Sequence, residues 1–432
     1  MRKGEVNVIT LGCSKNLVDS ERLMKLFAKA GYTVRHDPKR ITGEIVVVNT
    51  CGFIASAQEE SINMILALID AKNKGYINKI YVMGCLGERF REELKKELKE
   101  VDEIFGKFDW QQILSRLGHA HQSMLGDRLI TSPHHYAYIK ISEGCNQKCS
   151  YCAIPLITGK MKSREIGDVE QEVQALVNKG YTEFQLIAQD LTSYGLDLSN
   201  KSLLSDLLQR LSDIKGVKWL RLHYAYPTKF PFDILPIIRS RDNICKYLDI
   251  ALQHSSDKVL RLMRRGTTRA EMEDLIARIR GEVPDIVLRT TFIVGHPGET
   301  DHDFSDLLDF TQKMRFERMG AFAYSHEEGT YCYRHYKDEI PETTKLDRLS
   351  QLMDLQVEIG EAFSKQLVGK TKEVVIDKKE GDIFIGRTEY DSPEVDPEVL
   401  IYPGPSKKIK KGGYYPVQIV DTEGFDLIAD LI

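Results

Sequence analysis

Short runs of β-branched residues alternate with amphipathic segments along most of the chain, and this alternation limits the fold more than any other feature. In the first part of the chain, three such runs begin at Val6, Ile45 and Ile80. The segments between them have helical apolar spacing, and the first ends at Gly31, a residue typical of the position just beyond a helix. Strands that are joined by single crossover helices pair in parallel. We therefore predict a parallel α/β domain over residues 1–125.

Each of these three strands runs into a cysteine. The cysteines are Cys13, Cys51 and Cys85, which are 38 and 34 residues apart. Ligands of open parallel sheets bind beyond the carboxyl ends of the strands, so we expect the three thiols to converge on a metal site. Alternatively, three buried cysteines simply pack near the strand ends. A zinc site that is completed by water or by a non-cysteine fourth ligand is a further alternative, because the spacing of the cysteines does not identify the metal.

A second and longer alternation begins near residue 136 and contains six predicted strands. These strands start near Tyr136, Phe184, Trp219, Tyr247, Ile286 and Met319. The segments between them are typical of helices, and 168–180, for example, has an acidic first turn and a terminal glycine. The pattern predicts six βα units that form a partial parallel barrel over residues 131–365. The chemistry of such barrels lies on the loops that follow the strands.

The sequence pattern changes again in residues 366–432, where short predicted strands with alternating apolar and polar residues are separated by turns rich in Gly, Pro and charged residues. This pattern predicts a small all-β barrel. The segment contains nine Lys and Arg residues against thirteen Asp and Glu residues. A net-acidic barrel favours a basic protein partner over RNA.

The loop after the first of the six strands contains three thiols within eight residues and offers no fourth ligand. The thiols are those of Cys145, Cys149 and Cys152. A structural zinc needs four ligands, usually as two separated pairs. Three closely spaced thiols instead suit three irons of a 4Fe-4S cluster, whose fourth iron is then open to a small chelating molecule. The spacing therefore predicts a redox-active iron–sulfur site.

Six residues in or just after the strands are candidates for lining a cofactor pocket at this site. They are Gln189, Asp190, Gln253, Arg289, Gly295 and Gly298. The glycines permit close backbone approach to a cofactor, although a plain strand-to-helix turn uses the same residues. Asp190 could equally cap a helix. Arg289 lies inside an apolar strand, and a buried guanidinium needs a carboxylate, which could belong to the cofactor or to a core Glu.

Composition indicates a globular protein of the cytoplasm. The formal net charge is −4, no apolar run approaches the ~20 residues that span a bilayer, and Met1 is not followed by a signal-peptide core. Eight cysteines are too few for a disulfide framework in a chain of 432 residues, so we expect reduced thiols. Cys245 and Cys332 have no ligand-like neighbours, and we expect each to be a small buried hydrophobe.

The spacing Cys145-x3-Cys149-x2-Cys152 after the first strand of a parallel barrel resembles the radical S-adenosylmethionine superfamily. The whole chain resembles its methylthiotransferase family, with an N-terminal cysteine-bearing domain, a radical barrel and a C-terminal TRAM-type β-barrel. The resemblance implies a 4Fe-4S cluster and S-adenosylmethionine at this loop. It also implies that Cys13, Cys51 and Cys85 hold a second 4Fe-4S cluster, which faces the radical site as a sulfur source.

Within the family, the segments 11–21 and 49–54 resemble the branch that modifies ribosomal protein S-twelve. That resemblance implies methylthiolation of the β-carbon of an aspartate, with ribosomal protein S-twelve or the small ribosomal subunit as partner. It further implies an electron donor of flavodoxin or ferredoxin type, and we expect a monomer that does not associate with membranes. One position departs from the family pattern, because Thr158 stands where the family usually has arginine.

Three alternatives follow from the same residues. The same clusters and barrel could methylthiolate an adenosine in transfer RNA. A non-catalytic zinc protein could use its β-barrel to bind RNA, which predicts two zinc ions and no brown colour, but neither cysteine trio offers a fourth protein ligand. A radical methylase with one working cluster would leave Cys13, Cys51 and Cys85 without a role, which their shared position at strand ends disfavours.

Overall fold

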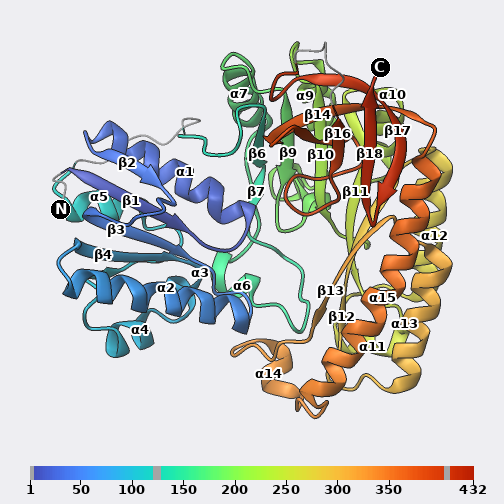
Figure 1. Cartoon of the computed structure of the whole chain (residues 1–432). Helices are drawn as coiled ribbons and strands as arrows, with labels where there is room; N and C mark the ends of the chain where they lie inside the picture. The colour runs from blue at the N-terminus through green and yellow to red at the C-terminus, as the bar shows by residue number, and fades with distance from the viewer. Residues whose placement is uncertain (1–3, 120–127, 403–408) are drawn as a thin grey trace.

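The computed structural model describes residues 4–119, 128–402 and 409–432. The chain forms an N-terminal sheet, a central sheet and a C-terminal closed barrel (Figure 1). The predicted boundary at residue 125 lies outside the described residues. Helix α15 (Glu342–Leu367) runs past the second predicted boundary, and the first strand of the C-terminal barrel begins at Thr371. No helix in the described ranges combines the length and the apolar character that a membrane crossing requires.

The N-terminal sheet has five parallel strands in the order β2-β1-β3-β4-β5. The strands are β1 (Glu5–Thr10), β2 (Thr33–His36), β3 (Gly43–Thr50), β4 (Ile77–Gly84) and β5 (Glu103–Ile104). The helices are α1 (Ser14–Lys29), α2 (Ala55–Asn73), α3 (Cys85–Arg89), α4 (Arg91–Glu97) and α5 (Trp110–Arg116). The sequence predicted the three central strands but not β2 and β5, because these short edge strands contain too few apolar residues to form a recognisable run.

Helices cover both faces of this sheet (Figure 1). The apolar stripe of α1, which includes Leu23 and Phe27, packs with α5 against one face. On the other face, α2 contributes Ile65 and Leu68, and α4 contributes Leu94. With both faces covered, the loops at the carboxyl ends of β1, β3 and β4 form the edge that meets the central domain.

The central sheet has six parallel strands in the order β13-β12-β11-β10-β9-β6. The strands are β6 (Tyr136–Lys140), β9 (Glu183–Ile187), β10 (Trp219–Ala225), β11 (Ile244–Gln253), β12 (Val287–Val294) and β13 (Arg318–Ala323). Since β6 and β13 are the two edges of the sheet, the predicted barrel is open. All five positions of β6 and of β9 are buried, as expected for parallel strands that are covered on both sides.

Helices and one short antiparallel pair connect these strands. The pair is β7 (Ser142–Glu143) and β8 (Lys162–Ser163). The first helical segments are α6 (Ile154–Thr158), α7 (Ile166–Val177), η1 (Leu191–Ser193), α8 (Leu196–Ser199), α9 (Leu204–Asp213) and η2 (Phe232–Ile234). The later ones are α10 (Leu235–Ser240), α11 (Asp257–Leu262), α12 (Arg269–Glu282), α13 (Asp301–Met314) and α14 (Tyr331–His335). Together with the strands they enclose one continuous apolar core.

The C-terminal segment forms the predicted small barrel, which closes in the order β14-β15-β16-β18-β17. Its strands are β14 (Thr371–Glu380), β15 (Ile383–Thr388), β16 (Val399–Tyr402), β17 (Tyr414–Glu423) and β18 (Asp426–Leu431). The barrel core continues into Trp219, Tyr247 and Val287, which lie near the starts of β10, β11 and β12. The C-terminal barrel therefore covers the amino ends of the central strands, and the carboxyl ends remain available to the N-terminal domain.

Candidate active site

The three-thiol loop lies at the carboxyl end of the central sheet. It follows the short strand β7 rather than β6 directly, and it leads into α6. The Cys145 N–H donates to the Gly159 carbonyl oxygen at 3.2 Å, which closes the loop. The backbone N–H groups of Gln147 and Ile154 donate to the sulfurs of Cys145 and Cys152, each at 3.4 Å. Such N–H···S contacts stabilise negative charge on a thiolate ligand.

The thiols of this loop influence one another's ionisation. Burial raises the pKa of Cys145 to about 12, and the charges of Asp190 and Cys149 add to this effect. Burial also raises the pKa of Cys152, again with contributions from the other two thiols. The raised pKa values favour the thiol forms of Cys145 and Cys152. A metal centre at this loop would release their protons, as thiolate ligation requires.

The structure brings Cys13, Cys51 and Cys85 together at the carboxyl edge of the N-terminal sheet. Cys13 directly precedes α1, Cys51 follows β3, and Cys85 opens α3 after β4. A Cβ at Gly12 would lie 2.9 Å from the Cys51 sulfur. The Cys85 thiol donates to the Asn16 side chain at 3.6 Å, within the first turn of α1.

The charge of Lys107 acts on all three of these thiols. Burial raises the pKa of Cys85 to about 11, and the charges of Cys13 and Cys51 add to this effect, whereas Lys107 opposes it. Cys13 is an exposed residue, and although desolvation of its sulfur by neighbouring groups acts to raise its pKa, Lys15 and Lys107 outweigh this effect, so the pKa of Cys13 lies below its ordinary value. The three N-terminal thiols therefore differ in acidity: the pKa of Cys13 is lowered, whereas the pKa values of Cys51 and Cys85 are raised.

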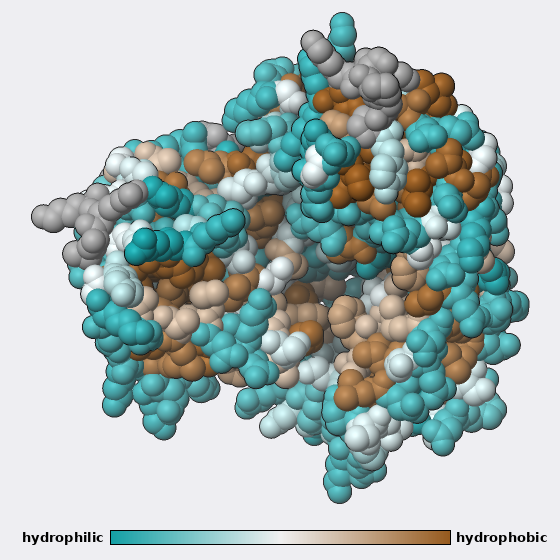
Figure 2. Space-filling model, in the orientation of Figure 1, coloured by the Kyte–Doolittle hydropathy of each residue, from teal (hydrophilic) through white to brown (hydrophobic). Residues whose placement is uncertain are grey.

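The two trios meet across the domain boundary. Cys85 packs against Ala153 and Ile157, and Ala153 is the residue next to Cys152. Helix α3, which Cys85 opens, thus lies against α6, which follows the three-thiol loop (Figure 1). Figure 2 shows the surface hollowed between the N-terminal domain and the rest of the molecule. The junction between the domains therefore places both sets of thiols around one region.

The groups around the two cysteine trios show whether each trio suits a single metal ion or an iron–sulfur cluster. Within the described ranges, no group of three or more His, Cys, Asp or Glu side chains is arranged to hold a metal ion. In the three-thiol loop, the groups that contact the sulfurs are donors, namely backbone N–H groups and the guanidinium of Arg265. In the N-terminal trio, backbone N–H groups contact Cys13 and Cys51, whereas the Cys85 thiol itself donates to Asn16. Donors around sulfur suit thiolates that carry negative charge, as in an iron–sulfur cluster. The chemistry of both trios therefore fits such a group.

Two of the candidate pocket residues, Gln189 and Asp190, follow β9 next to the three-thiol loop. Asp190 accepts hydrogen bonds from Ser193 at 2.6 Å and from the Gln147 side chain at 2.9 Å. Asp190 stands at the N-cap position of η1, but its carboxylate accepts from side chains and makes no capping bond to the backbone, so the structure ties it to the cysteine loop rather than to a helix cap. Gln189 donates to Glu143, and its side-chain oxygen is buried without a hydrogen-bond partner among the described residues. That oxygen is a free acceptor for a bound ligand.

Gln253 ends β11 with a φ of 75°, a conformation that is costly for a residue with a side chain. The next residue, His254, is fully buried, and its Nδ1 accepts the Ser256 N–H at 2.9 Å. Its Nε2 lies 3.5 Å from Glu299 and has no hydrogen-bond partner among the described residues. The end of β11 therefore combines a strained backbone with a buried ring nitrogen whose contact with Glu299 is too loose for a hydrogen bond, and both features are frequent at functional sites.

The two candidate glycines form a turn that packs closely on the protein itself. A Cβ at Gly298 would lie 2.7 Å from Leu262, and one at Gly295 would overlap the Lys345 side chain. The Glu299 carboxylate accepts the Gly295 N–H at 2.8 Å and pairs with Arg348 at 2.7 Å. A plain strand-to-helix turn thus explains why both positions are glycine. The Gly295 N–H already donates to Glu299 and is not available to a cofactor.

Arg289 does not join the group at the carboxyl ends of the strands. It is the third residue of β12, and its guanidinium pairs with Asp396 at 2.5 Å. Asp396 precedes β16 of the C-terminal barrel, which covers the opposite ends of the strands. The buried guanidinium has its carboxylate, as expected, but the partner is neither a cofactor nor a core Glu, and the assignment of Arg289 to the cofactor pocket is corrected.

Sequence reasoning missed a buried chain of charges that joins the two domains. Lys107 donates to Asp19 at 2.8 Å, and Lys140 donates to the other oxygen of Asp19 at 2.5 Å. Lys140 also pairs with Glu143 at 2.5 Å, and Lys107 contacts Asn16 at 3.1 Å, so the chain reaches from one trio to the other. The signal was a charged residue, Asp19, on the buried face of a predicted helix.

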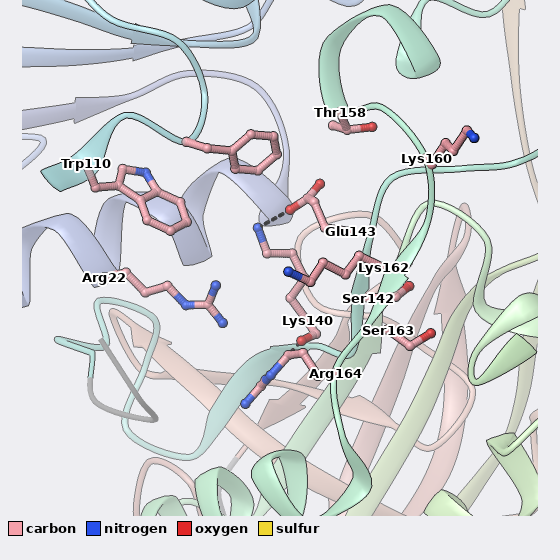
Figure 3. A pocket seen from close by; sticks show the side chains of 11 residues that line it. Arg22, Trp110, Lys140, Ser142, Glu143, Thr158, Lys160, Lys162, Ser163 and Arg164 are labelled. Atoms are coloured by element: carbon pink, nitrogen blue, oxygen red, sulfur yellow. Dashed lines mark hydrogen bonds and ion pairs between the residues drawn. The ribbon is translucent and has the colours of Figure 1, made fainter. Parts of the chain in front are cut away.

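A pocket of about 430 Å³ opens beside this chain, where α1 and the start of α5 meet β6, β7 and β8 (Figure 3). Its charged lining consists of Arg22, Lys140, Glu143, Lys160, Lys162 and Arg164. Thr158 also lines it and donates to the Ile154 carbonyl oxygen at 3.0 Å. The residue at the usual arginine position therefore makes a contact within its own helix, and the neighbouring cations supply the positive charge of the pocket.

The two remaining cysteines are buried, as expected. Cys245 is packed in the core shared with the C-terminal barrel. Cys332 has polar partners that the sequence did not reveal, because its sulfur lies 3.1 Å from the Ser150 hydroxyl and 3.2 Å from His296 Nε2. Since Ser150 belongs to the three-thiol loop, Cys332 anchors the start of α14 to that loop.

Three family models match the chain. "Uncharacterized protein family UPF0004" matches residues 5–106, "Radical SAM superfamily" matches residues 139–311, and "TRAM domain" matches residues 368–432. In the solved structures, the radical S-adenosylmethionine methyltransferase TsrM from Kitasatospora setae has a TM-score of 0.53 and 14% identity, covering 88% of this chain and 82% of that one. The cobalamin-dependent radical enzyme OxsB has the same TM-score with 12% identity and 82% and 61% coverage. These likenesses show the fold.

Full-length relatives are much more similar. "Ribosomal protein uS12 methylthiotransferase RimO" of Parabacteroides distasonis is 57% identical over 100% of both chains. Proteins with the same name from Porphyromonas gingivalis and Cytophaga hutchinsonii are 58% and 47% identical, over 100% of this chain and 100% and 98% of theirs. The chain therefore belongs to the RimO methylthiotransferase family of radical SAM enzymes, which use S-adenosylmethionine and a 4Fe-4S cluster.

Proposed function

We propose that this enzyme methylthiolates the β-carbon of an aspartate in ribosomal protein uS12. The relatives that match the chain from end to end are named for modification of uS12. The observation that carries the chemistry is the contact of Cys85 with Ala153, which joins the N-terminal trio to the loop of Cys145, Cys149 and Cys152. Methylthiolation needs a radical at the substrate carbon and a sulfur source beside it, and the two trios supply adjacent positions for both.

We assign Cys145, Cys149 and Cys152 as the ligands of the radical SAM cluster. When bound, this cluster supplies the low-potential electron that cleaves S-adenosylmethionine and yields the radical. The chain's own groups hold the ligands in place, through the N–H groups of Gln147 and Ile154 on two of the sulfurs. Asp190 holds the Gln147 side chain and thereby fixes the loop between the first two ligands.

We assign Cys13, Cys51 and Cys85 as the ligands of a second 4Fe-4S cluster, which supplies or carries the inserted sulfur. The positive charge of Lys107 acts on all three thiols and favours their thiolate forms. Asn16 accepts the Cys85 S–H and is itself held by Lys107. Gln189, Asp190 and Gln253 lie at the ends of β9 and β11 and are the remaining candidates for the S-adenosylmethionine pocket.

Partners follow from this reaction. The substrate is uS12, free or in the small ribosomal subunit, and the acidic C-terminal barrel suits a basic protein of that kind. Reduction of the clusters requires an electron donor of flavodoxin or ferredoxin type. The reaction belongs in the cytoplasm, where ribosomes are assembled, and we propose that the enzyme acts as a monomer.

The substrate is tested by mass spectrometry of uS12 and of bulk transfer RNA from cells with and without the gene. We expect the methylthio mass to disappear from uS12 alone when the gene is deleted. Loss of the modification from transfer RNA, with uS12 unchanged, would establish the transfer-RNA alternative instead. Restoring the gene in the deletion strain must restore the missing mass.

The two cysteine trios are tested by anaerobic reconstitution and by matched substitutions. We expect about eight irons per chain, as two 4Fe-4S clusters require. Cys149→Ala should abolish cleavage of S-adenosylmethionine, whereas Cys51→Ala should retain cleavage and lose sulfur transfer. About four irons after complete reconstitution, or full sulfur transfer by Cys51→Ala, refutes the second cluster, and two zinc ions in a colourless protein refute both.

A further inference from the structure

One buried cation differs from all the others in the described parts of the chain. Nine Lys and Arg residues are buried there: Lys107, Arg128, Lys140, Arg221, Arg265, Arg318, Lys345, Arg348 and Arg387. Eight of them form an ion pair with an Asp or Glu. Arg265 is 3% exposed and has no carboxylate partner among the described residues. A buried charge of this kind needs a compensating charge nearby.

The surroundings of Arg265 show where that compensation lies. Its Nη1 donates to the Cys149 sulfur at 3.4 Å and to the Tyr151 hydroxyl at 3.5 Å. Its Nη2 donates to the Ala251 carbonyl oxygen, and its Nε is buried without a hydrogen-bond partner among the described residues. The guanidinium lies 4.0 Å from the ring centroid of Tyr226. Among the groups in contact with Arg265, the Cys149 sulfur is therefore the one that becomes anionic when it binds a metal centre.

Tyr226 strengthens this arrangement from the other side. Its hydroxyl donates to the Arg265 carbonyl oxygen at 3.0 Å and lies 3.7 Å from the Cys149 sulfur. One aromatic side chain thus fixes the backbone of Arg265, stacks on its guanidinium and touches the same sulfur. The guanidinium has little freedom to turn away from Cys149, so its charge acts on this sulfur at a fixed position.

We propose that Arg265 is the counter-ion of the cluster held by Cys149 and that its charge sets the reduction potential of that cluster. The proposal rests on the assignment of Cys145, Cys149 and Cys152 as cluster ligands. A cluster with thiolate ligands gains one further negative charge when it accepts an electron, and a cation in a buried site favours the more negative state. Arg265 therefore raises the potential and makes the cluster easier to reduce. It is a positioning residue that acts through a ligand sulfur.

The test is the midpoint potential of this one cluster, measured by redox titration followed by electron paramagnetic resonance. The full chain is used with Cys13, Cys51 and Cys85 all changed to Ala, so that a second cluster does not contribute to the signal. Into this background we introduce Arg265→Gln, Arg265→Lys or Arg264→Gln. Arg264 is the matched control, because it is adjacent, exposed and carries the same charge.

We expect Arg265→Gln to lower the equilibrium constant for reduction about tenfold, which is a shift of about 59 mV to lower potential for one electron. Arg265→Lys keeps the charge and should stay close to the background protein, and Arg264→Gln should not shift. An unchanged potential in Arg265→Gln, or equal shifts in Arg265→Gln and Arg264→Gln, overturns the proposal.

Failure to assemble a cluster is also informative. If Arg265→Gln does not retain iron, the charge-retaining Arg265→Lys must retain it, and loss of iron in both variants shows that shape rather than charge matters and overturns the proposal. If the background protein with an intact Arg265 shows no iron–sulfur signal, the assignment of Cys145, Cys149 and Cys152 fails instead. The two failures are therefore distinguishable.

Discussion

At the residue scale, the three-thiol loop depends on a single backbone turn at Gly144. This residue has a φ of 78°, and a Cβ there would overlap the Lys160 carbonyl oxygen. That oxygen belongs to the main chain, so rotation of a side chain does not relieve the clash. Because Gly144 immediately precedes Cys145, the same displacement moves the first cysteine of the loop.

Gly144→Ala should therefore reduce the iron retained by the loop and destabilise the protein. The left-handed backbone alone costs an alanine about 1–2 kcal/mol, and the overlap adds to this. Gly369→Ala is the control, because Gly369 also has a positive φ, 84°, has no atom within 4 Å of its added Cβ and lies outside the loop. The measurements are iron per chain after reconstitution and the unfolding midpoint in urea. Equal iron retention in the two variants would contradict this account of Gly144.

At the scale of elements, helices α12 and α13 begin with the same capping box but in different surroundings. Thr268 and Glu271 cap α12 at the surface, and Thr300 and Asp303 cap α13. The Asp303 carboxylate also accepts hydrogen bonds from Ser256 at 2.6 Å and from Lys258 at 2.8 Å. The cap of α13 thus connects the turn after β12 to the segment after β11, and both segments end strands of the central sheet.

Replacement of the two cap threonines compares these surroundings directly. Thr300→Ala should cost about 1–2 kcal/mol and Thr268→Ala about 0.5–1 kcal/mol, within the usual range for loss of an N-cap. The costs differ because Thr300 also orients the Asp303 carboxylate, which Ser256 and Lys258 bind. Urea denaturation measures the cost, and hydrogen exchange in the first turn of α13 locates it. A larger cost for Thr268→Ala would show that the shared carboxylate does not matter.

At the scale of the whole molecule, one buried carboxylate, Asp19, pairs with cations of both of the first two domains. Asp19 is fully buried on α1 and binds Lys107 of its own domain and Lys140 of the central sheet. Since α1 also leads from Cys13, a shift of this helix would move the N-terminal trio relative to the cysteine loop. The same ion pairs thus hold the domains together and align their sites.

Asp19→Asn should destabilise the chain by about 3–5 kcal/mol, because it leaves the buried Lys107 without a carboxylate partner among the described residues and Lys140 with Glu143 alone. The matched change Asp70→Asn affects an exposed pair with Lys74 and should cost less than about 1 kcal/mol. Thermal unfolding of both variants measures the difference. If Asp19→Asn unfolds at the same temperature as Asp70→Asn, the buried chain does not hold the domains together.

The same carboxylate predicts a dependence on pH. Burial acts to raise the pKa of Asp19, but the charges of Lys107 and Lys140 outweigh it and lower the pKa to about 2. Because the folded pKa lies below the unfolded one, the stabilisation is fully present above about pH 4 and is lost as the pH falls toward 2. Unfolding free energies measured from pH 5 to pH 2 should fall less steeply for Asp19→Asn than for the parent chain.

Much of the fold and the candidate metal ligands could be predicted from residues that are near one another in the sequence. The strand and helix periods predicted the parallel N-terminal domain, the open six-stranded barrel and the closed C-terminal barrel. The position of a cysteine after each N-terminal strand predicted the gathering of Cys13, Cys51 and Cys85, because parallel strands end at the same edge. The edge strands β2 and β5 were missed, since runs of four and two residues carry no clear period.

The sequence by itself determined which side chains end each strand, because a periodic pattern and a loop spacing are local properties of the chain. Only the tertiary structure decided which buried charges meet. Arg289 pairs with Asp396, 107 positions away, and Arg265 reaches Cys149 across 116 positions. Nothing near Arg265 in the sequence distinguishes it from Arg264, yet one guanidinium is buried against the Cys149 sulfur and the other residue is exposed. The physical reason is that a buried charge is compensated by whichever groups the packed core brings within contact, and packing is not a local property.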